Sequence, residues 1–296
     1  MPELPEVETA RRIVERELVG RAVEAIALGL PKLMRDSPEP TLAPLLGKTL
    51  VGAGRRAKVL AFEFDGGLTL LSHLKLAGQI AVHHDDGTRF AAGHPVPNPA
   101  GPYPHKASHL IVRFSGARTL FWSDARQFGW LRLVPSAEVE AILAGFRFGP
   151  EAVGPDGIGV EELTRRLARR TIPIKTALLD QGVLAGLGNI YVDEALHAAR
   201  LHPSRPANGL TPDELVALHV AIGWSLERGI AQGGATIVHN KAYPRDGFPQ
   251  VHARLGEPCP TCATAIVKTR VGARGTYWCP VCQPDSVPTA ENPTLG

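Results

Sequence analysis

Residues 259–282 read CPTCATAIVKTRVGARGTYWCPVC, and this stretch holds all four cysteines of the chain in the spacing C-x2-C-x16-C-x2-C. Each C-x2-C pair can place two thiolates on one tight turn, and two such turns complete the tetrahedron that zinc prefers. Two disulfides within a short hairpin are the competing interpretation, but a cytosolic chain is kept reduced. The spacing therefore predicts one zinc ion in a small ribbon that needs its metal to fold. The ion is expected to be structural, since four protein ligands leave no open position for catalysis. The ligands would be Cys259, Cys262, Cys279 and Cys282.

The composition around this stretch is that of a folded protein of about two domains. At roughly 150 residues per domain, 296 residues suggest two. Hydrophobic residues make up 44% and charged residues 21%, which permits a buried core. No apolar run approaches the ~20 residues that a membrane span needs. The opening MPELPEVETA is neither a signal peptide nor a transit peptide, so we expect a protein of the bacterial cytosol or nucleoid. We also expect it to be a monomer. A net charge of +3 permits a nucleic-acid partner if the basic residues cluster.

The hydrophobic pattern changes along the chain and indicates an α+β protein of several domains. Residues 3–19 carry apolar side chains at helical spacing. From about 21 to 134, short apolar and β-branched runs separated by turn signals predict a β-sandwich or barrel. Five prolines between residues 93 and 104 predict a surface loop. After about residue 136 the pattern is helical, and Thr211-Pro212-Asp213-Glu214 has the features of a helix start.

The N-terminus holds the first candidate chemical group. If the initiator Met is removed, Pro2 presents a secondary amine, and an α-amine titrates near pH 8, so part of it is nucleophilic at neutral pH. Attack on a sugar C1′ would give an iminium, which is a good electron sink. Glu3 or Glu6 beside it could act as a general acid or base. The alternative interpretation is an ordinary helix start, where proline and acidic residues are favoured.

Three other features suit contact with phosphate. A glycine-rich turn, Gly186-Leu187-Gly188-Asn189, exposes backbone N–H groups and an amide, although it could be only a tight turn between helices. Basic residues also gather in two places, where they are either solvated charges or phosphate contacts. The first group is Lys48, Arg55, Arg56 and Lys58, and the second is Lys268, Arg270 and Arg274 within the zinc ribbon.

Taken together, these features indicate one protein family far more specifically than any of them does alone. The opening MPELPEVET, the FGPE at 148–151, the GLGNIYVDEAL at 186–196 and the four-cysteine pattern resemble the formamidopyrimidine-DNA glycosylase and endonuclease VIII family. The resemblance is colinear from Pro2 to Cys282. It implies an N-terminal β-sandwich with an N-terminal helix (1–135), a helix-two-turn-helix domain (136–236) and a zinc-finger β-hairpin (237–284). Residues 285–296 are expected to be a disordered tail.

The resemblance also implies an activity on damaged double-stranded DNA. Members flip a damaged base out of the duplex, cleave its glycosidic bond and nick the strand by β,δ-elimination through an iminium on the N-terminal proline. Pro2 matches that nucleophile, Glu3 the catalytic acid and Glu6 a supporting carboxylate. Lys58 matches a lysine that binds phosphate and assists the chemistry. A non-catalytic damage-binding zinc protein is the alternative, but it would have no use for these four residues together.

The same resemblance assigns DNA contacts. Asn189 matches an amide that grips phosphate, and Arg274 matches the zinc-finger arginine that clamps phosphates beside the lesion. His73 lies in SHLKLAG, where Leu76 matches an intercalating wedge that fills the vacated stack. Phe128 matches a second wedge, in the stretch that also holds Arg126 and Gln127.

The sequence features that bear on lesion preference indicate two different branches of the family. The purine-specific branch typically shows Asp-Pro-Arg-Arg-Phe-Gly, whereas residues 124–129 read Asp-Ala-Arg-Gln-Phe-Gly. Gln127 lacks the charged fork that reads the orphaned cytosine. The short segment 234–259 is also more similar to endonuclease VIII, which prefers oxidised pyrimidines. The opening MPELPEVE and the retained Arg126 and Phe128 favour oxidised purines, which is the preference we expect.

Overall fold

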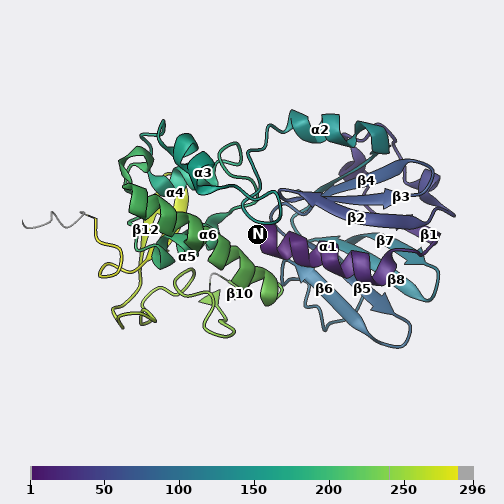
Figure 1. Cartoon of the computed structure of the whole chain (residues 1–296). Coiled ribbons are helices and arrows are strands. Elements are labelled where there is room, and N and C mark those ends of the chain that lie inside the picture. The colour runs from purple at the N-terminus through teal and green to yellow at the C-terminus, as the bar shows by residue number, and fades with distance from the viewer. Residues whose placement is uncertain (1, 240, 286–296) are drawn as a thin grey trace, which may run out of the picture.

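The computed structural model describes residues 2–239 and 241–285, which form two lobes that meet near the N-terminus (Figure 1). The first lobe is a sandwich of two antiparallel sheets with strand orders β1-β7-β8-β5-β6 and β2-β3-β4-β9. Apolar side chains alternate inward from both sheets and enclose Leu60, Ile80 and Trp122. The strands are β1 (Val23–Leu28), β2 (Leu50–Arg56), β3 (Val59–Phe64), β4 (Leu68–His73), β5 (Gly78–His84), β6 (Arg89–Gly93), β7 (Ser108–Phe114), β8 (Arg118–Asp124) and β9 (Trp130–Pro135). The predicted β-sandwich is therefore confirmed.

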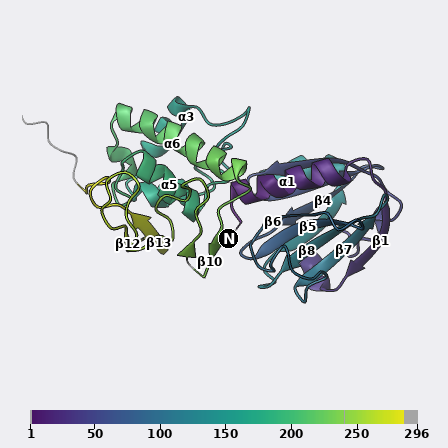
Figure 2. The same ribbon diagram turned by 90° about the horizontal axis from the view of Figure 1, so that it is seen from below.

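Helix α1 (Leu4–Leu18) lies along the sandwich and reaches the second lobe with its first turn (Figure 2). Val7, Val14 and Leu18 pack into the sandwich core, which explains the apolar spacing seen in the sequence. Leu4, at the start of the same helix, packs into the core of the second lobe instead. The N-terminus is therefore fixed at the junction between the lobes.

The second lobe is helical. Its core lies among α3 (Val160–Leu167), α4 (Ile174–Leu179), α5 (Asn189–Ala198) and α6 (Pro212–Ala231). Thr211 caps α6, because its hydroxyl accepts the Glu214 N–H while the Glu214 carboxylate accepts the Thr211 N–H. Two short hairpins complete the lobe: β10 (Ile237–Val238) with β11 (Lys241–Ala242), and β12 (Val267–Val271) with β13 (Arg274–Trp278).

Helix α2 (Val139–Gly145) lies in the range expected for the helical domain, but it packs on the outer face of the second sheet. Short 3-10 turns occur at Pro31–Met34, Ala43–Leu45, Ser136–Glu138 and Ala207–Gly209. In the described part of the chain, none of the helices combines the length and the apolar character that crossing a membrane requires. Most of the tail expected from residue 285 lies outside the described residues.

Candidate DNA-binding active site

A pocket of about 320 Å³ lies between the lobes, next to the N-terminus. It collects side chains from the sandwich, from the two-turn segment 181–188 that precedes α5, and from the β12–β13 hairpin. Six of the residues predicted from the sequence line it: Pro2, Lys58, His73, Leu76, Asn189 and Arg274. Residues up to 272 positions apart in sequence, Pro2 and Arg274, are thus brought to one place.

Glu3 lies behind Pro2 rather than on the wall of the pocket. Its side chain is buried, and its carboxylate accepts the N–H groups of Ile190 (3.1 Å) and Tyr191 (3.4 Å) at the start of α5. A negative charge is stabilised there by the helix dipole and by N–H groups that have no partner within the helix. Gly188 makes this approach possible, since a Cβ at that position would lie 2.3 Å from Glu3 Cδ.

Glu6 is a second buried carboxylate on α1. It accepts the Glu3 N–H (2.8 Å), the Tyr191 hydroxyl (2.7 Å) and the Ala235 N–H (2.8 Å). Burial, and secondly the negative charge of Glu3, raise the pKa of Glu6. Its contacts join the first turn of α1, helix α5 and the segment after α6. Glu6 therefore fixes the surroundings of Pro2 without lining the pocket itself.

Lys58 projects from the turn between β2 and β3 and donates to the carbonyl of Leu187 over 2.9 Å. Burial lowers the pKa of Lys58, and the cationic Arg274 lowers it further, whereas Glu3 and Glu6 raise it. A lysine with a lowered pKa can hold or release a proton nearer to neutral pH than a free one. Lys58 lines the same pocket as Pro2, so it can exchange a proton with a molecule bound there.

Asn189 and Arg274 both line the pocket. The Asn189 amide nitrogen donates to the carbonyl of Gly275 (3.0 Å), while its Oδ1 has no hydrogen-bond partner within the described part of the chain. Arg274 is exposed and follows the two-residue turn Gly272-Ala273 of the β12–β13 hairpin. The exposed guanidinium of Arg274 is therefore free to meet an anion in the pocket.

The predicted wedge residues lie on two adjacent loops at one end of the sandwich. The ladder pairs Gly78 with Asp124 and His73 with Trp130, which brings the loops 74–77 and 125–129 together. His73 Nδ1 accepts the Lys75 N–H (2.9 Å), and burial holds the pKa of His73 at about 3, so the imidazole is neutral and shapes the loop that carries Leu76.

Asp124 shapes the second loop. Its carboxylate accepts the N–H groups of Arg126, Phe128 and Gly129 at 2.8–2.9 Å. The loop consequently turns outward, with Gln127 at a φ of +57° and Phe128 51% exposed. Arg126 lies over the Phe128 ring, 5.1 Å from its centroid. These three side chains face solvent outside the pocket.

The four cysteines gather at one site whose geometry fits zinc. All four Sγ atoms lie within 4.8 Å of one another, with 3.8 Å between Cys259 and Cys282 and 3.4 Å between Cys262 and Cys279. Tetrahedral coordination with Zn–S bonds of about 2.3 Å requires sulfur separations of about 3.8 Å. The cysteines form a structural zinc site, and His197 Nε2 lies 3.3 Å from Cys259 Sγ, in the position of an outer partner.

Three buried residues that sequence reasoning missed attach the zinc hairpin to the helical lobe. Lys175 donates to Asp193 (2.6 Å) and to the carbonyl of Gly275 (3.0 Å). The Asp193 carboxylate also accepts the Tyr277 N–H (3.1 Å), and Glu194 accepts the N–H groups of residues 250–252. The acids of GLGNIYVDEAL were visible as a motif, but Lys175 lies 18 positions from Asp193, and the backbone N–H groups that the two acids accept come from residues 56 or more positions away.

Comparison with known proteins agrees with this geometry. Residues 1–131 match the formamidopyrimidine-DNA glycosylase N-terminal domain, residues 148–241 match the H2TH domain of the same enzymes, and residues 256–284 match the zinc finger found in FPG and IleRS. The formamidopyrimidine-DNA glycosylase of Herpetosiphon aurantiacus is 41% identical over 290 residues, covering 96% of this chain and 100% of that protein. That of Streptococcus thermophilus is 38% identical over 288 residues, covering 96% and 99%.

Solved structures give the same result. A complex of Lactococcus lactis Fpg with DNA containing an abasic site superposes with a TM-score of 0.82 at 34% identity, covering 96% of this chain and 100% of the other. A complex of the Lactococcus lactis protein with Fapy-dG-containing DNA gives 0.81 at 34% identity, covering 95% and 100%. The three domain matches, the full-length relatives and the four-cysteine site agree: the chain belongs to the formamidopyrimidine-DNA glycosylase family of base-excision-repair enzymes.

Proposed function

We propose that this chain removes oxidised purines from duplex DNA and nicks the strand at the abasic site, with the amine of Pro2 as nucleophile. The observation that carries the proposal is the pocket between the lobes, in which Pro2 stands beside Lys58, Asn189 and Arg274. A nucleophile surrounded by cationic and amide groups suits an anionic substrate. We also propose that the protein acts in the bacterial cytosol.

The chemistry begins once removal of Met1 frees the Pro2 nitrogen. Its lone pair attacks C1′ of the damaged nucleotide, the C1′–base bond breaks, and the base leaves with the proton of the amine. Opening of the sugar ring breaks the C1′–O4′ bond and gives an iminium, and O4′ takes a proton. Loss of a C2′ proton then expels the 3′ phosphate, and a second elimination expels the 5′ phosphate.

Glu3, Glu6 and Lys58 have distinct roles in this reaction. Glu3 is the proposed proton donor to O4′, and Glu6 holds the backbone of Glu3 in place through a 2.8 Å hydrogen bond. Lys58, whose pKa is lowered by burial, is the proposed group that moves a proton during elimination and binds a flanking phosphate. Asn189 and Arg274 are the proposed phosphate clamps.

Two apolar side chains on the sandwich loops, the partly exposed Leu76 and the exposed Phe128, support the flipping step. Leu76 and Phe128 stand on adjacent loops at the end of the sandwich where the pocket opens. Insertion of an apolar side chain into the base stack offsets part of the few kcal/mol that flipping costs. Arg126 and Gln127 lie beside Phe128, where a side chain can face the base opposite the lesion.

The preference for purines is supported by the names of the relatives, all formamidopyrimidine-DNA glycosylases. A duplex panel tests it, with single lesions of 8-oxoguanine, formamidopyrimidine, 5-hydroxycytosine or thymine glycol. We expect faster excision of the two purine lesions. Faster excision of the two pyrimidine lesions would establish the alternative, an endonuclease VIII-like preference.

The nucleophile is tested separately. Borohydride reduces an iminium to a stable amine, so it should trap the enzyme on abasic DNA through Pro2. Pro2→Gly should retain some primary-amine chemistry but lose most of the activity. An adduct mapped to an internal lysine, or Met1 retained in active enzyme, would contradict the assignment.

A further inference from the structure

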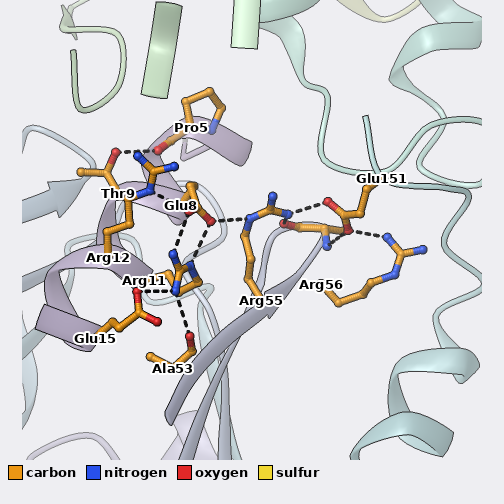
Figure 3. Close-up of polar contacts among 11 residues, drawn as sticks. Pro5, Glu8, Thr9, Arg11, Arg12, Glu15, Ala53, Arg55, Arg56 and Glu151 are labelled. Carbon is orange, nitrogen blue, oxygen red and sulfur yellow. Dashed lines mark hydrogen bonds and ion pairs between the residues drawn. The ribbon is translucent and has the colours of Figure 1, made fainter. Parts of the chain in front are cut away.

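Arg55 and Arg56 are paired with carboxylates of the protein itself (Figure 3). Arg55 donates to Glu8 on α1 over 2.9 Å and to Glu151 over 2.5 Å, and Arg56 donates to Glu151 over 2.5 Å. The sequence left a solvated strand face and phosphate neutralisation open for these two arginines. The structure favours neither, because Arg55 is only 12% exposed and both guanidinium groups are engaged by carboxylates of the protein.

The Glu151 carboxylate has a third donor, the N–H of Ala57, at 2.7 Å. Ala57 and Lys58 form the two-residue turn between β2 and β3, where Arg56 pairs with Val59. Ala57 has a φ of +53°, the left-handed region that normally suits glycine and that is strained for a residue with a Cβ. The hydrogen bond that the Ala57 N–H donates to Glu151 supports this conformation at the residue directly before Lys58.

The backbone around Glu151 is attached to the segment that receives the other end of Lys58. Glu151 forms an isolated parallel β-bridge with Ala185. The Gly149 N–H donates to the carbonyl of Gln181 over 2.8 Å. The same segment supplies the Leu187 carbonyl to which the Lys58 ammonium donates. Glu151 therefore joins the two parts of the structure that hold Lys58, its turn and its acceptor.

From this geometry we propose that Glu151 is a positioning residue, which fixes the Ala57–Lys58 turn against the segment 181–188 and so sets the place of the Lys58 ammonium beside Pro2. Glu151 is not among the residues that line the pocket, and it acts through the turn rather than on substrate. The value of this placement for catalysis rests on the function proposed above. The placement itself does not, and it can be measured without DNA.

Two variants and a matched control separate the contribution of the Glu151 charge from that of its hydrogen bond with Ala57. Glu151→Ala removes all three contacts, whereas Glu151→Gln keeps an oxygen that can accept the Ala57 N–H but loses the charge. Glu162→Ala is the control, because Glu162 also accepts from two arginines, Arg165 and Arg166, and touches no part of the β2–β3 turn. Glu151→Gln should give an intermediate result, and it keeps the test usable if Glu151→Ala folds poorly.

The first measurement is the pH dependence of amine acetylation at each lysine of the free protein, read by peptide mass spectrometry. The titratable and charged groups around the Lys58 ammonium are Glu3 just before α1, Glu6 on α1, Arg274 on β13, His73 on β4 and the amine of Pro2. In the wild type and in Glu162→Ala, Lys58 should titrate below the exposed Lys32, because burial disfavours its charge. In Glu151→Ala the midpoint of Lys58 should rise towards that of Lys32.

The second measurement is single-turnover nicking of a duplex with a preformed abasic site. At saturating enzyme we expect Glu151→Ala to lose about tenfold or more in rate, since a misplaced group slows the chemical step even when the duplex is fully bound. A lowered rate with an unmoved Lys58 midpoint would overturn the proposal, as would a wild-type rate. If the wild type does not nick abasic DNA, the proposed function fails, while the acetylation result still decides the placement.

Discussion

At the scale of single residues, the absence of a side chain at Gly188 permits the closest contact in the site. Helix α5 begins directly against the Glu3 carboxylate, and an added Cβ would lie 2.6 Å from each of its oxygens. The backbone φ of Gly188 is −141°, which any residue adopts, so space alone requires glycine here. The position of Pro2 depends on Glu3, its neighbour in the chain.

Gly188→Ala should therefore displace Glu3 and lower both stability and activity. Overpacking of this kind costs about 1–3 kcal/mol, and we expect most nicking of an abasic duplex to be lost. Gly223→Ala is the control: Gly223 lies within α6 with nothing inside 4 Å of an added Cβ, and alanine should stabilise that helix by up to about 1 kcal/mol. Thermal unfolding and nicking assays check both. Full activity in Gly188→Ala would show that Glu3 can move without consequence.

Gln127 gives a second prediction at this scale. It is exposed on the loop that Asp124 holds, and a neutral amide offers one donor group and one acceptor group in place of a charged fork. Loss of a charged bidentate pair removes about 1–3 kcal/mol of base discrimination. We expect lesion:cytosine to be favoured over lesion:adenine by less than about 10-fold, and Gln127→Arg to sharpen that preference. Single-turnover cleavage opposite each of the four bases tests this, and unchanged selectivity in the variant would place Gln127 away from the orphaned base.

At the scale of elements, local patterns predicted most of the structure. The helix at 3–19 and the cap at Thr211 follow from neighbours within four residues, and both are found, as α1 and as the capped start of α6. Helix α3, in the stretch after residue 136 where the pattern is helical, ends at Leu167. The partners of Arg55 could not be predicted, because Glu8 and Glu151 lie 47 and 96 positions away and nothing local links them.

Helix α1 carries a carboxylate whose ionisation stabilises the fold. Hydrogen bonds from Arg11 and Arg12, with the charges of Arg11 and Arg55, outweigh burial and hold the pKa of Glu8 at about 2, below its ordinary value of 4.5. A carboxyl with a lowered pKa contributes stability above its unfolded pKa, and that contribution is lost as the pH falls from about 4.5 to 2. Glu8 is buried, but its partner Arg12 is exposed, so water screens part of this pairing and we expect about 1–2 kcal/mol.

Glu8→Gln should therefore lower the free energy of unfolding at pH 7 but change it little at pH 2. Denaturant unfolding at several pH values between 2 and 7 gives the difference from the wild type at each pH. Glu39→Gln is the control, since Glu39 is exposed and makes no ion pair within residues 2–239 and 241–285. A difference between Glu8→Gln and wild type that stays constant with pH would show that the loss comes from packing rather than from ionisation.

At the scale of the whole molecule, the site exists only where three parts of the chain converge. Lys58 comes from the sandwich, Asn189 from the start of α5 and Arg274 from the zinc hairpin, and all three line one pocket with Pro2. The sequence supplied these residues through a family resemblance, not through spacing, because no local pattern links positions so far apart. The buried Lys175–Asp193 pair that carries the hairpin was missed for the same reason.

This convergence predicts how much each of the three residues contributes to DNA affinity and to its salt dependence. A cationic side chain that neutralises a phosphate releases about one counterion, so Lys58→Ala and Arg274→Ala should each lower the slope of log K against log[salt] by about one. The double variant should lower it by about two, because the residues stand on different domains and meet different phosphates. Asn189→Ala should weaken binding by about 3–10-fold with the slope unchanged, since an amide displaces no counterion. Fluorescence anisotropy with a non-cleavable abasic duplex at four salt concentrations measures all five proteins. If the double variant shows the slope of a single one, Lys58 and Arg274 share one phosphate, and the lobes grip the strand at fewer points than the pocket suggests.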